Sequence, residues 1–487
     1  MDDRHALLFS EIPGLDVVGR RAARGAVLSV LRFGFPFVLG IGVSIVLTKI
    51  LIPAQFGVYA IFGTITPVLA IIIGSVAVAF VVARQFTAED INAVFWTMEA
   101  VSILIGGAIV AAGLAGMASV TVNRLLVTLG VFLPLIPMRF PADISFYRQI
   151  RMDKLALVEA SEVTAYQAVA VACAYAGLGS LSFGIGLDAG AFVAVLVNFS
   201  LARWRPQRPA FAGSAHWLRI GLPYMLNSSL VYAKERASFI LLAAVAGAAT
   251  LGLFSWAYTA AMVLVTLTLL ATQGLYGLFA QIRDDQEAVG RVISIVLRLI
   301  AVGTFGFSAC LAGSIRPLIT TVFSPLWLPA THCFWLLLIA SSMMSLAAPL
   351  QSLAAADGRV HLMNRWLLVQ IAIIWIVGIP AAILSGPGGF ALCFVVGAFL
   401  FLALIYRSTA ARYQVEALTD LVLCAVAGIG AAGCGFAVAN SLGRNWLSLA
   451  ASAGASLLVY CALTLGWRRR QIFDDTATVF ELIRRRA

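Results

Sequence analysis

The sequence predicts an all-α polytopic membrane protein of about 14 transmembrane helices, in which two pseudo-symmetric six-helix lobes precede two C-terminal helices. Composition carries the membrane assignment: 61% of the 487 residues are hydrophobic, 11% are charged, and the mean hydropathy is +0.98. Soluble proteins have about 45–50% apolar and about 25% charged residues. An internal repeat carries the two lobes, because LRFGFP at residues 31–36 returns as LRIGLP at residues 218–223.

Apolar segments of membrane-spanning length follow one another along the chain. A helix needs about 20 apolar residues to cross the hydrocarbon core of a bilayer. Such segments lie near residues 29–50, 58–83, 94–116, 119–138, 155–177, 181–201, 217–246, 252–280, 289–313, 318–352, 365–384, 388–406, 420–441 and 446–467. The tenth segment contains a non-helical lead-in, SPLWLP at residues 324–329. External loops such as 247–251 and 385–389 are very short, so no segment outside the membrane is expected to fold as a domain.

The spans and the repeat divide the chain into five parts. We expect a cytoplasmic N-terminal segment, an N-lobe with the first six helices, a C-lobe with the next six, two extra helices and a basic cytoplasmic tail. These parts correspond to residues 1–28, 29–208, 209–410, 411–467 and 468–487.

Basic residues gather on one side of the predicted membrane. With both termini cytoplasmic, 27 of the 33 Lys and Arg residues lie inside, and four lie outside at Lys49, Arg124, Arg316 and Arg444. Cytoplasmic loops carry an excess of Lys and Arg, so this asymmetry predicts an even number of spans with the N- and C-termini inside. A cytoplasmic surface facing anionic lipid explains the net charge of +11 without a nucleic-acid partner.

Three charged residues, Lys234, Glu235 and Arg236, lie in the middle of the apolar stretch 218–246. At a rise of about 1.5 Å per residue, Lys234 lies about 25 Å along this span, near the midplane of the bilayer. A charge there costs at least about 2.5–3.5 kcal/mol on insertion scales, and such residues usually face a bundle interior or a wet cavity. The triplet therefore predicts a pathway or a binding site. The alternative is an ion-paired cluster that only ties this helix to a neighbour.

The repeat places the triplet within the predicted architecture. Both copies open a span on the cytoplasmic side, an even number of helices apart, so the repeat is parallel and its axis runs along the membrane normal. Two halves related in this way place a substrate site at their interface, near the midplane. The first span of the second half is the one that carries the triplet.

Six motifs occur in a specific order and spacing over about three quarters of the chain. They are LTKILIPAQFGVYA at residues 47–60, FYRQIRMDKL at 146–155, LRIGLP at 218–223, LGLFSWA at 251–257, SPLWLPA at 324–330 and AADGR at 355–359. In these motifs the chain resembles the Wzx-type polysaccharide flippases of the MOP superfamily, whose cousins are MATE and MurJ. The resemblance implies alternating access and the movement of an undecaprenyl-diphosphate-linked oligosaccharide across the bacterial inner membrane, for exopolysaccharide, capsule or O-antigen synthesis.

The resemblance implies a transporter and not an enzyme, since no bond is made or broken. We expect no cofactor and no metal, and the seven cysteines show no metal-binding spacing. The expected partners are the lipid-linked oligosaccharide, membrane lipids, a polysaccharide polymerase and export proteins, with the chain itself monomeric.

Three alternatives compete with this interpretation. A MATE-like small-molecule or cation antiporter is disfavoured because the first span has no buried carboxylate for cation coupling. That span also lacks the Arg-Asp pair expected of a MurJ-like flippase. A polysaccharide polymerase or ligase would need a substantial periplasmic loop, which is missing. A non-transporting scaffold would leave the intramembrane charges without a purpose.

A lipid diphosphate must be held by cations, and Arg236 and Lys234 are the leading candidates. Successive helical residues are about 100° apart, so these two diverge by about 200° and cannot both face one cavity squarely. Ser229 and Tyr232 share the Arg236 face, which favours Arg236 as the cavity-facing cation. Glu235 is predicted to neutralise the other cation or to take part in energy coupling.

Further candidates lie in the N-lobe. Lys49 is one of only three lysines in an arginine-rich chain, and it can bind substrate or anchor the outer end of the first span. Arg124 can line the cavity mouth or snorkel to the interface. Asp188, inside the sixth span, can couple transport to protons or pair with one of these two cations. By contrast, three glutamates near cytoplasmic helix ends are expected to be solvated: Glu99, Glu159 and Glu162.

Overall fold

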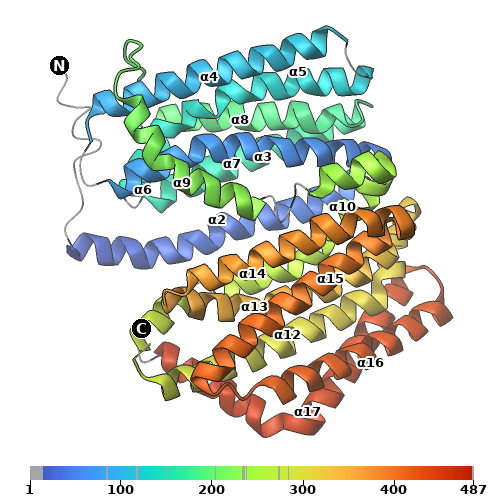
Figure 1. Ribbon diagram of the computed structural model, residues 1–487. Helices are drawn as coiled ribbons and strands as arrows, with labels where there is room; N and C mark the ends of the chain where they lie inside the picture. Colours follow the sequence, from blue (N-terminus) through green and yellow to red (C-terminus); the bar gives the residue numbers. More distant parts are fainter. Residues whose placement is uncertain are drawn as a thin grey trace. The chain divides into compact units, whose positions relative to one another are not determined.

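The computed structural model describes residues 15–83, 86–116, 119–149, 151–202, 205–232, 236, 238–272, 275–282 and 284–484. Within these residues the chain is helical and contains no β-strand, which confirms the predicted all-α fold. Contacts divide the chain into two compact units, Met1–Ile240 and Leu241–Ala487, which we call unit 1 and unit 2. Figure 1 shows the helices of both.

Unit 1 is built from long helices joined by short turns. Its elements are α2 (Leu15–Ile50), α3 (Pro53–Val82), α4 (Ala88–Leu114), α5 (Val120–Leu135), the 3₁₀ helix η1 (Pro137–Arg139), α6 (Phe140–Arg148), α7 (Met152–Tyr175), α8 (Leu181–Ala202) and α9 (Ser214–Tyr232). In unit 1, α7 packs against α2 and α8, α4 packs against α5, and α9 packs against α3. Phe80 of α3 stacks on Trp217 of α9 with ring centroids 4.1 Å apart, in a core that also holds Ile144.

Small residues let neighbouring helices of unit 1 approach closely. Gly106 of α4 faces Gly130 of α5, and a Cβ on Gly106 would lie 2.5 Å from the Gly130 carbonyl oxygen. Helix association in a bilayer depends on such close packing, because lipid tails are as apolar as the side chains. The all-helical backbone has a related cause: in lipid, each peptide group must find its hydrogen-bond partner within the protein.

Unit 2 has a similar helical build. Its elements are α10 (Ser238–Thr272, which begins in unit 1), α11 (Leu275–Ile282), α12 (Gln286–Thr321), the 3₁₀ helix η3 (Pro325–Ala330), α13 (Thr331–Ala356), α14 (Val360–Ala372), the π-helical turn η4 (Ile373–Val377), α15 (Gly378–Tyr413), α16 (Leu418–Leu442) and α17 (Trp446–Arg484). Here α12 packs against α13, α16 and α17, and α13 packs against α15.

Two of the predicted loops contract to a single non-helical glycine. Gly247 inside α10 has φ 83° and Gly386 inside α15 has φ 64°, so each glycine joins two predicted segments without a longer loop. Glycine is the residue that adopts such positive φ values without steric cost. Within the described residues, ten helical stretches are long and apolar enough to cross a membrane. The multi-pass architecture therefore holds, while the total of 14 spans and the predicted lobe boundaries stay predictions.

The lead-in to the tenth predicted span is helical, contrary to expectation. Residues 325–330 form η3, in which Trp327 N donates to the Ser324 carbonyl oxygen at 3.0 Å. The sequence contains Pro325 and Pro329, which have no N–H to donate, and this favours a short 3₁₀ turn over a regular α-helix. The Ser324 hydroxyl accepts a bond from Leu326 N and so caps the turn.

Candidate functional site

One face of α7 carries a row of polar side chains through a helix that is otherwise mostly apolar. Glu159, Glu162 and Tyr166 follow at spacings of three and four residues, which places them on the same side of the helix. With a rise of about 1.5 Å per residue, Glu159 lies about 10 Å and Glu162 about 15 Å beyond the start of α7 at Met152. Each of the three side chains contacts a partner on a different element of unit 1.

Glu159 holds an arginine of α2. The Arg32 guanidinium donates to both carboxylate oxygens of Glu159 through its Nε and Nη2 atoms, and Nη2 also donates to the Tyr147 hydroxyl at 3.1 Å. Only 11% of the Arg32 side chain and 28% of the Glu159 side chain are exposed. A two-pronged contact of this kind fixes the orientation of the guanidinium plane as well as its position.

Glu162 belongs to a second charged group. Arg139 Nη1 donates to Glu162 Oε2 at 2.6 Å, and Arg139 Nε lies 3.9 Å from Asp143 Oδ2 on α6. Asn198 of α8 donates to Asp143 Oδ1 at 3.3 Å. Charges removed from water are tolerated when they are paired and hydrogen-bonded. This group pairs its charges with residues from four elements, while the buried Arg139 Nε has no hydrogen-bond partner among the described residues.

The third member of the row, Tyr166, lies further along α7. Its hydroxyl is 2.9 Å from the Tyr59 hydroxyl of α3, and the Tyr59 ring stacks on Phe183 of α8 at 3.8 Å. The polar row therefore changes from ion pairs to a neutral hydroxyl pair along the helix. Together these contacts join α2, α3, α6 and α8 to α7.

This arrangement corrects the expectation that three glutamates are solvated. Glu159 and Glu162 form ion pairs inside the α7 span, and Glu99 is buried in α4 with 4% exposure. Glu99 Oε2 has no hydrogen-bond partner among the described residues. The prediction failed because the apolar spans that bury these carboxylates bring partners from distant parts of the sequence, 127 residues away for Arg32 and Glu159.

Of the intramembrane triplet at residues 234–236, the structure describes Arg236. Lys234 and Glu235 lie outside the described residues, so their predicted roles stay predictions. Arg236 lies between α9 and α10, half-buried, with Cζ 5.5 Å from the centre of the Phe239 ring. A guanidinium over an aromatic face gains an electrostatic attraction from the ring quadrupole.

Two predicted neighbours of Arg236 lie on α9. Ser229 is half-buried. The Tyr232 hydroxyl donates to the carbonyl oxygens of Gly63 at 3.1 Å and Thr64 at 2.9 Å, both on α3. Tyr232 therefore ties the end of α9 to α3, and its role toward a glycan stays a prediction.

The remaining candidates are separate from the charged groups on α7. Lys49, in the last turn of α2, and Arg124, in the first turn of α5, are exposed. Asp188 of α8 is half-buried, and its buried Oδ1 atom has no hydrogen-bond partner in the described part of the chain. No ion pair joins Asp188 to Lys49 or Arg124 among the described residues, so the predicted pairing is not seen.

Sequence reasoning missed the ionic groups centred on Arg32 and Arg139. A signal was present in the spacing of Glu159, Glu162 and Tyr166, because polar residues at intervals of three and four form one face of a helix. A second signal was the spacing of Arg139 and Asp143, four residues apart in a proline-rich stretch. A guanidinium binds carboxylate and phosphate oxygens through the same planar fork, so these groups present the chemistry that an anionic substrate needs.

The long, apolar, all-helical build defines a class, the multi-pass membrane proteins. Among solved structures, the chain is similar to the lipid II flippase MurJ in an inward closed conformation, with a TM-score of 0.67 and 13% identity, covering 92% of this chain and 99% of that one. It is also similar to an inward-facing MATE-family multidrug resistance transporter of the MOP superfamily, with a TM-score of 0.59 and 13% identity, covering 79% and 98%. At this identity the likeness concerns the fold.

The amino-acid sequence identifies the family of the chain. A family model described as polysaccharide biosynthesis protein matches residues 46–332, more than half of the chain. The chain belongs to this family of polysaccharide biosynthesis proteins, and it has the fold of the MOP superfamily, which confirms the resemblance read from its motifs. A search of curated protein sequences finds no match.

Proposed function

We propose that this protein is a flippase that moves an undecaprenyl-diphosphate-linked oligosaccharide from the cytoplasmic to the periplasmic leaflet of the bacterial inner membrane. The oligosaccharide is the repeat unit of an exopolysaccharide, a capsule or an O-antigen, and it crosses by alternating access without any covalent step. The polyprenyl tail stays in lipid while the diphosphate and the sugars pass through the protein.

The match of the polysaccharide biosynthesis family over residues 46–332 is the observation that carries this proposal. It supports a role in glycan assembly, and the MurJ-like fold supports transport as the way in which the chain takes part. MurJ itself is described as a lipid II flippase. A lipid-linked glycan is the substrate that meets both conditions, because it must change leaflet between its synthesis and its polymerisation.

The diphosphate requires cations that are held away from bulk water. We assign Arg236 and Lys234 as its main ligands, with Lys49 and Arg124 as further cations along the route and with Ser229 and Tyr232 toward the sugars. A charge–dipole and hydrogen-bonding site of this kind is stronger in a low-dielectric interior than in water. The half-buried position of Arg236 against Phe239 supports its place in this set.

Energy coupling is assigned to carboxylates within the spans. Asp188 is the stronger of two candidates, because its buried Oδ1 atom has no hydrogen-bond partner among the described residues. Glu235, beside the two main cations, is the other. We place the chain in the inner membrane as a monomer with both termini cytoplasmic, next to a polysaccharide polymerase and export proteins.

Deletion of the gene in its own host tests the function. We expect loss of one surface polysaccharide and accumulation of its complete lipid-linked repeat unit in the inner leaflet. If the repeat unit instead accumulates in the outer leaflet, the protein acts after the transport step, and the flippase assignment fails.

Complementation with point variants then tests the site. Arg236→Ala and Lys234→Ala should restore little polysaccharide, whereas Arg444→Ala, which removes an exposed arginine before α17, should restore it fully. Full restoration by both of the first two variants, at expression levels equal to the Arg444→Ala protein, would refute the residue assignment and leave the transport assignment intact.

A further inference from the structure

A small pocket lies at the turn between α13 and α14 in unit 2. It is partly open to solvent, and its space of about 260 Å³ includes that open solvent. The residues that line it come from α13, the turn, α14 and α15: Leu353, Ala354, Asp357, Arg359, Leu362, Trp366, Ser408, Thr409 and Tyr413. This is the place where the AADGR motif at residues 355–359 meets the end of α15.

The motif fixes the backbone that positions Arg359. Gly358 has φ +72°, and the backbone N–H groups of Gly358 and Arg359 donate to the carbonyl oxygens of Ala355 at 3.0 Å and Ala354 at 2.9 Å. A left-handed glycine that closes the last carbonyl groups in this way is a common helix C-terminus. The chain then starts α14 directly at Val360, so Arg359 is held at the junction of two helices.

The acidic residue of the pocket is already neutralised. The Tyr413 hydroxyl lies 2.7 and 2.8 Å from the two carboxylate oxygens of Asp357, and Arg412 Nη1 lies 3.9 Å from Asp357 Oδ2. Only 4% of the Asp357 side chain is exposed. The carboxylate is thus buried behind the tyrosine and does not set the charge of the opening.

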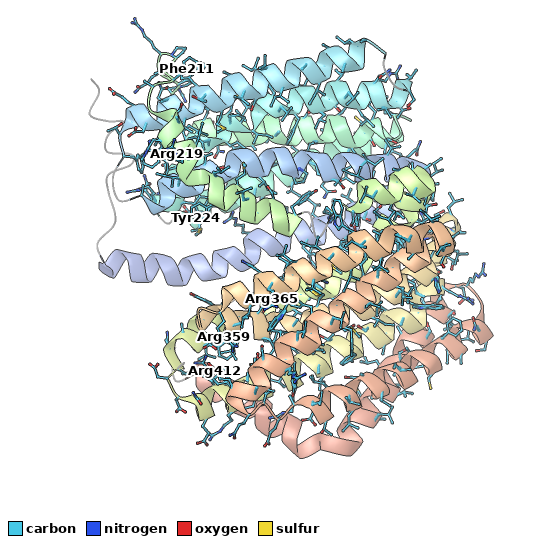
Figure 2. All side chains as sticks on the ribbon, in the orientation of Figure 1. Phe211, Arg219, Tyr224, Arg359, Arg365 and Arg412 are labelled. Atoms are coloured by element: carbon cyan, nitrogen blue, oxygen red, sulfur yellow. The ribbon has the colours of Figure 1, made fainter. Side chains whose placement is uncertain are left out.

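The charged side chains at the pocket leave a net positive charge. Arg412 offsets the Asp357 carboxylate, and the charge of Arg359, which also lines the pocket, remains. Figure 2 shows Arg359, Arg365 and Arg412 at the same end of unit 2, where α13 and α15 end and α14 begins. The N-terminus of the 13-residue helix α14 adds its partial positive charge at the same place.

The other walls are apolar. Leu353, Leu362 and Trp366 border the same space as Arg359. A site lined by an arginine with apolar walls beside it matches a lipid headgroup, in which a phosphate adjoins a glycerol and two acyl chains. Basic pockets between transmembrane helices on the cytoplasmic side are known to suit anionic phospholipids.

We propose that the pocket at the α13–α14 turn binds the phosphate of an anionic phospholipid from the cytoplasmic leaflet, with Arg359 as its main ligand. Arg365 adds positive charge at the same end of unit 2, whereas Arg412 offsets the Asp357 carboxylate. This inference rests on the proposed orientation with both termini cytoplasmic, which puts the turn after the tenth predicted span on the cytoplasmic side. It does not depend on which glycan lipid is transported.

Native mass spectrometry of the full-length protein in detergent, titrated with phosphatidylglycerol, tests the site. Arg359→Gln should weaken binding of the first phosphatidylglycerol about five-fold, as expected for the loss of one arginine near a lipid phosphate. The matched control is Arg291→Gln, which removes an exposed arginine of α12 outside the pocket and should change the affinity less than about two-fold. Equal weakening by both variants would overturn the proposal, because only general surface charge would then be involved.

Two measurements on the unmodified protein distinguish other phosphate sources. Inorganic phosphate should not displace phosphatidylglycerol, and undecaprenyl diphosphate should not displace it at equal concentration; displacement by either ligand assigns the pocket to that ligand and refutes a phospholipid site. Binding should also weaken with added salt, since the charges lie near the surface. Retention that is independent of salt would refute the role of Arg359 even if Arg359→Gln failed to fold.

Discussion

Loss of the Arg139 guanidinium should destabilise unit 1 far more than loss of an exposed guanidinium. Arg139 has 22% of its side chain exposed and contacts two carboxylates, Glu162 at 2.6 Å and Asp143 at 3.9 Å. Arg139→Met keeps most of the apolar volume but leaves both carboxylates without their cation. Removing one partner of a buried ion pair costs about 3–5 kcal/mol, and the remaining exposure of Arg139 places our expectation at the lower end, about 3 kcal/mol.

The control is the exposed pair of Arg291 and Glu287 at the start of α12. Their side chains lie 2.7 Å apart, as close as the pair of Arg139 and Glu162, but they are 69% and 84% exposed. An exposed pair with this i,i+4 spacing contributes about 0.3–0.5 kcal/mol, so Arg291→Met should have almost no effect. Burial is therefore the main difference between the two variants.

Equilibrium unfolding of the purified protein in mixed micelles of mild detergent and dodecyl sulfate measures the free energies of unfolding of the Arg139→Met and Arg291→Met variants. A double-mutant cycle with Glu162→Met separates the pair from the single residues, and the double variant should recover part of the loss, because only Asp143 then remains unpaired. If Arg139→Met costs no more than Arg291→Met, the ionic group is not formed as described, and the reasoning about its buried charges is refuted.

Three further substitutions test the packing, each by the free energy of unfolding. Gly106→Ala should cost about 1–3 kcal/mol, because its Cβ would lie 2.5 Å from a carbonyl oxygen of α5, whereas Gly107→Ala meets open space and should be neutral. Tyr232→Phe should cost about 1 kcal/mol, because the hydrogen bonds of its hydroxyl to α3 are lost. Tyr224→Phe, at an exposed position, should cost nothing. Equal values for the two variants would contradict the hydrogen bonds between Tyr232 and α3. Gly247→Ala, at φ 83°, should cost about 1–3 kcal/mol, and a value no larger than that of Gly107→Ala would contradict the backbone argument.

The features of the fold that depend on composition and local spacing could be predicted from the sequence. The long apolar segments correspond to helices. The loops at Gly247 and Gly386 are short because few polar residues separate the apolar segments there and a glycine can make the turn. The helical lead-in at residues 325–330 was missed, because prolines that prevent an α-helix still permit a 3₁₀ turn.

The ionic groups of the candidate site could not be predicted in the same way. Arg32 and Glu159 are 127 residues apart in sequence, and only the packing of α2 on α7 brings them together. A glutamate near the end of an apolar segment was expected to reach water, which is the usual outcome for a charged side chain. An arginine from another helix pairs with the glutamate inside the protein instead. No local pattern in the sequence shows which distant helix will supply that arginine.

The two copies of the internal repeat also differ in what their arginines do. Arg32 in the first copy is paired with Glu159, whereas Arg219 in the second copy, on α9, is exposed (Figure 2). The repeat therefore preserves a backbone motif at the start of a span and not an ionic contact. Aligned residues in the two copies therefore make different contacts, and the role of a residue in one copy cannot be assigned to its counterpart in the other by alignment.

The pairing of Arg32 bears on how a flippase could use it. A phosphate that binds the Nε and Nη2 atoms of this guanidinium must replace the Glu159 carboxylate, which has the same charge sign and bonds to that edge of the planar fork. The gain from the new contact is offset by the loss of the old one, so the net affinity is small. Transport requires binding that is strong enough to admit a ligand and weak enough to release it. An arginine that already has a carboxylate partner meets the second condition. Under the proposed function, tight holding of the diphosphate is therefore assigned to other cations, such as Arg236.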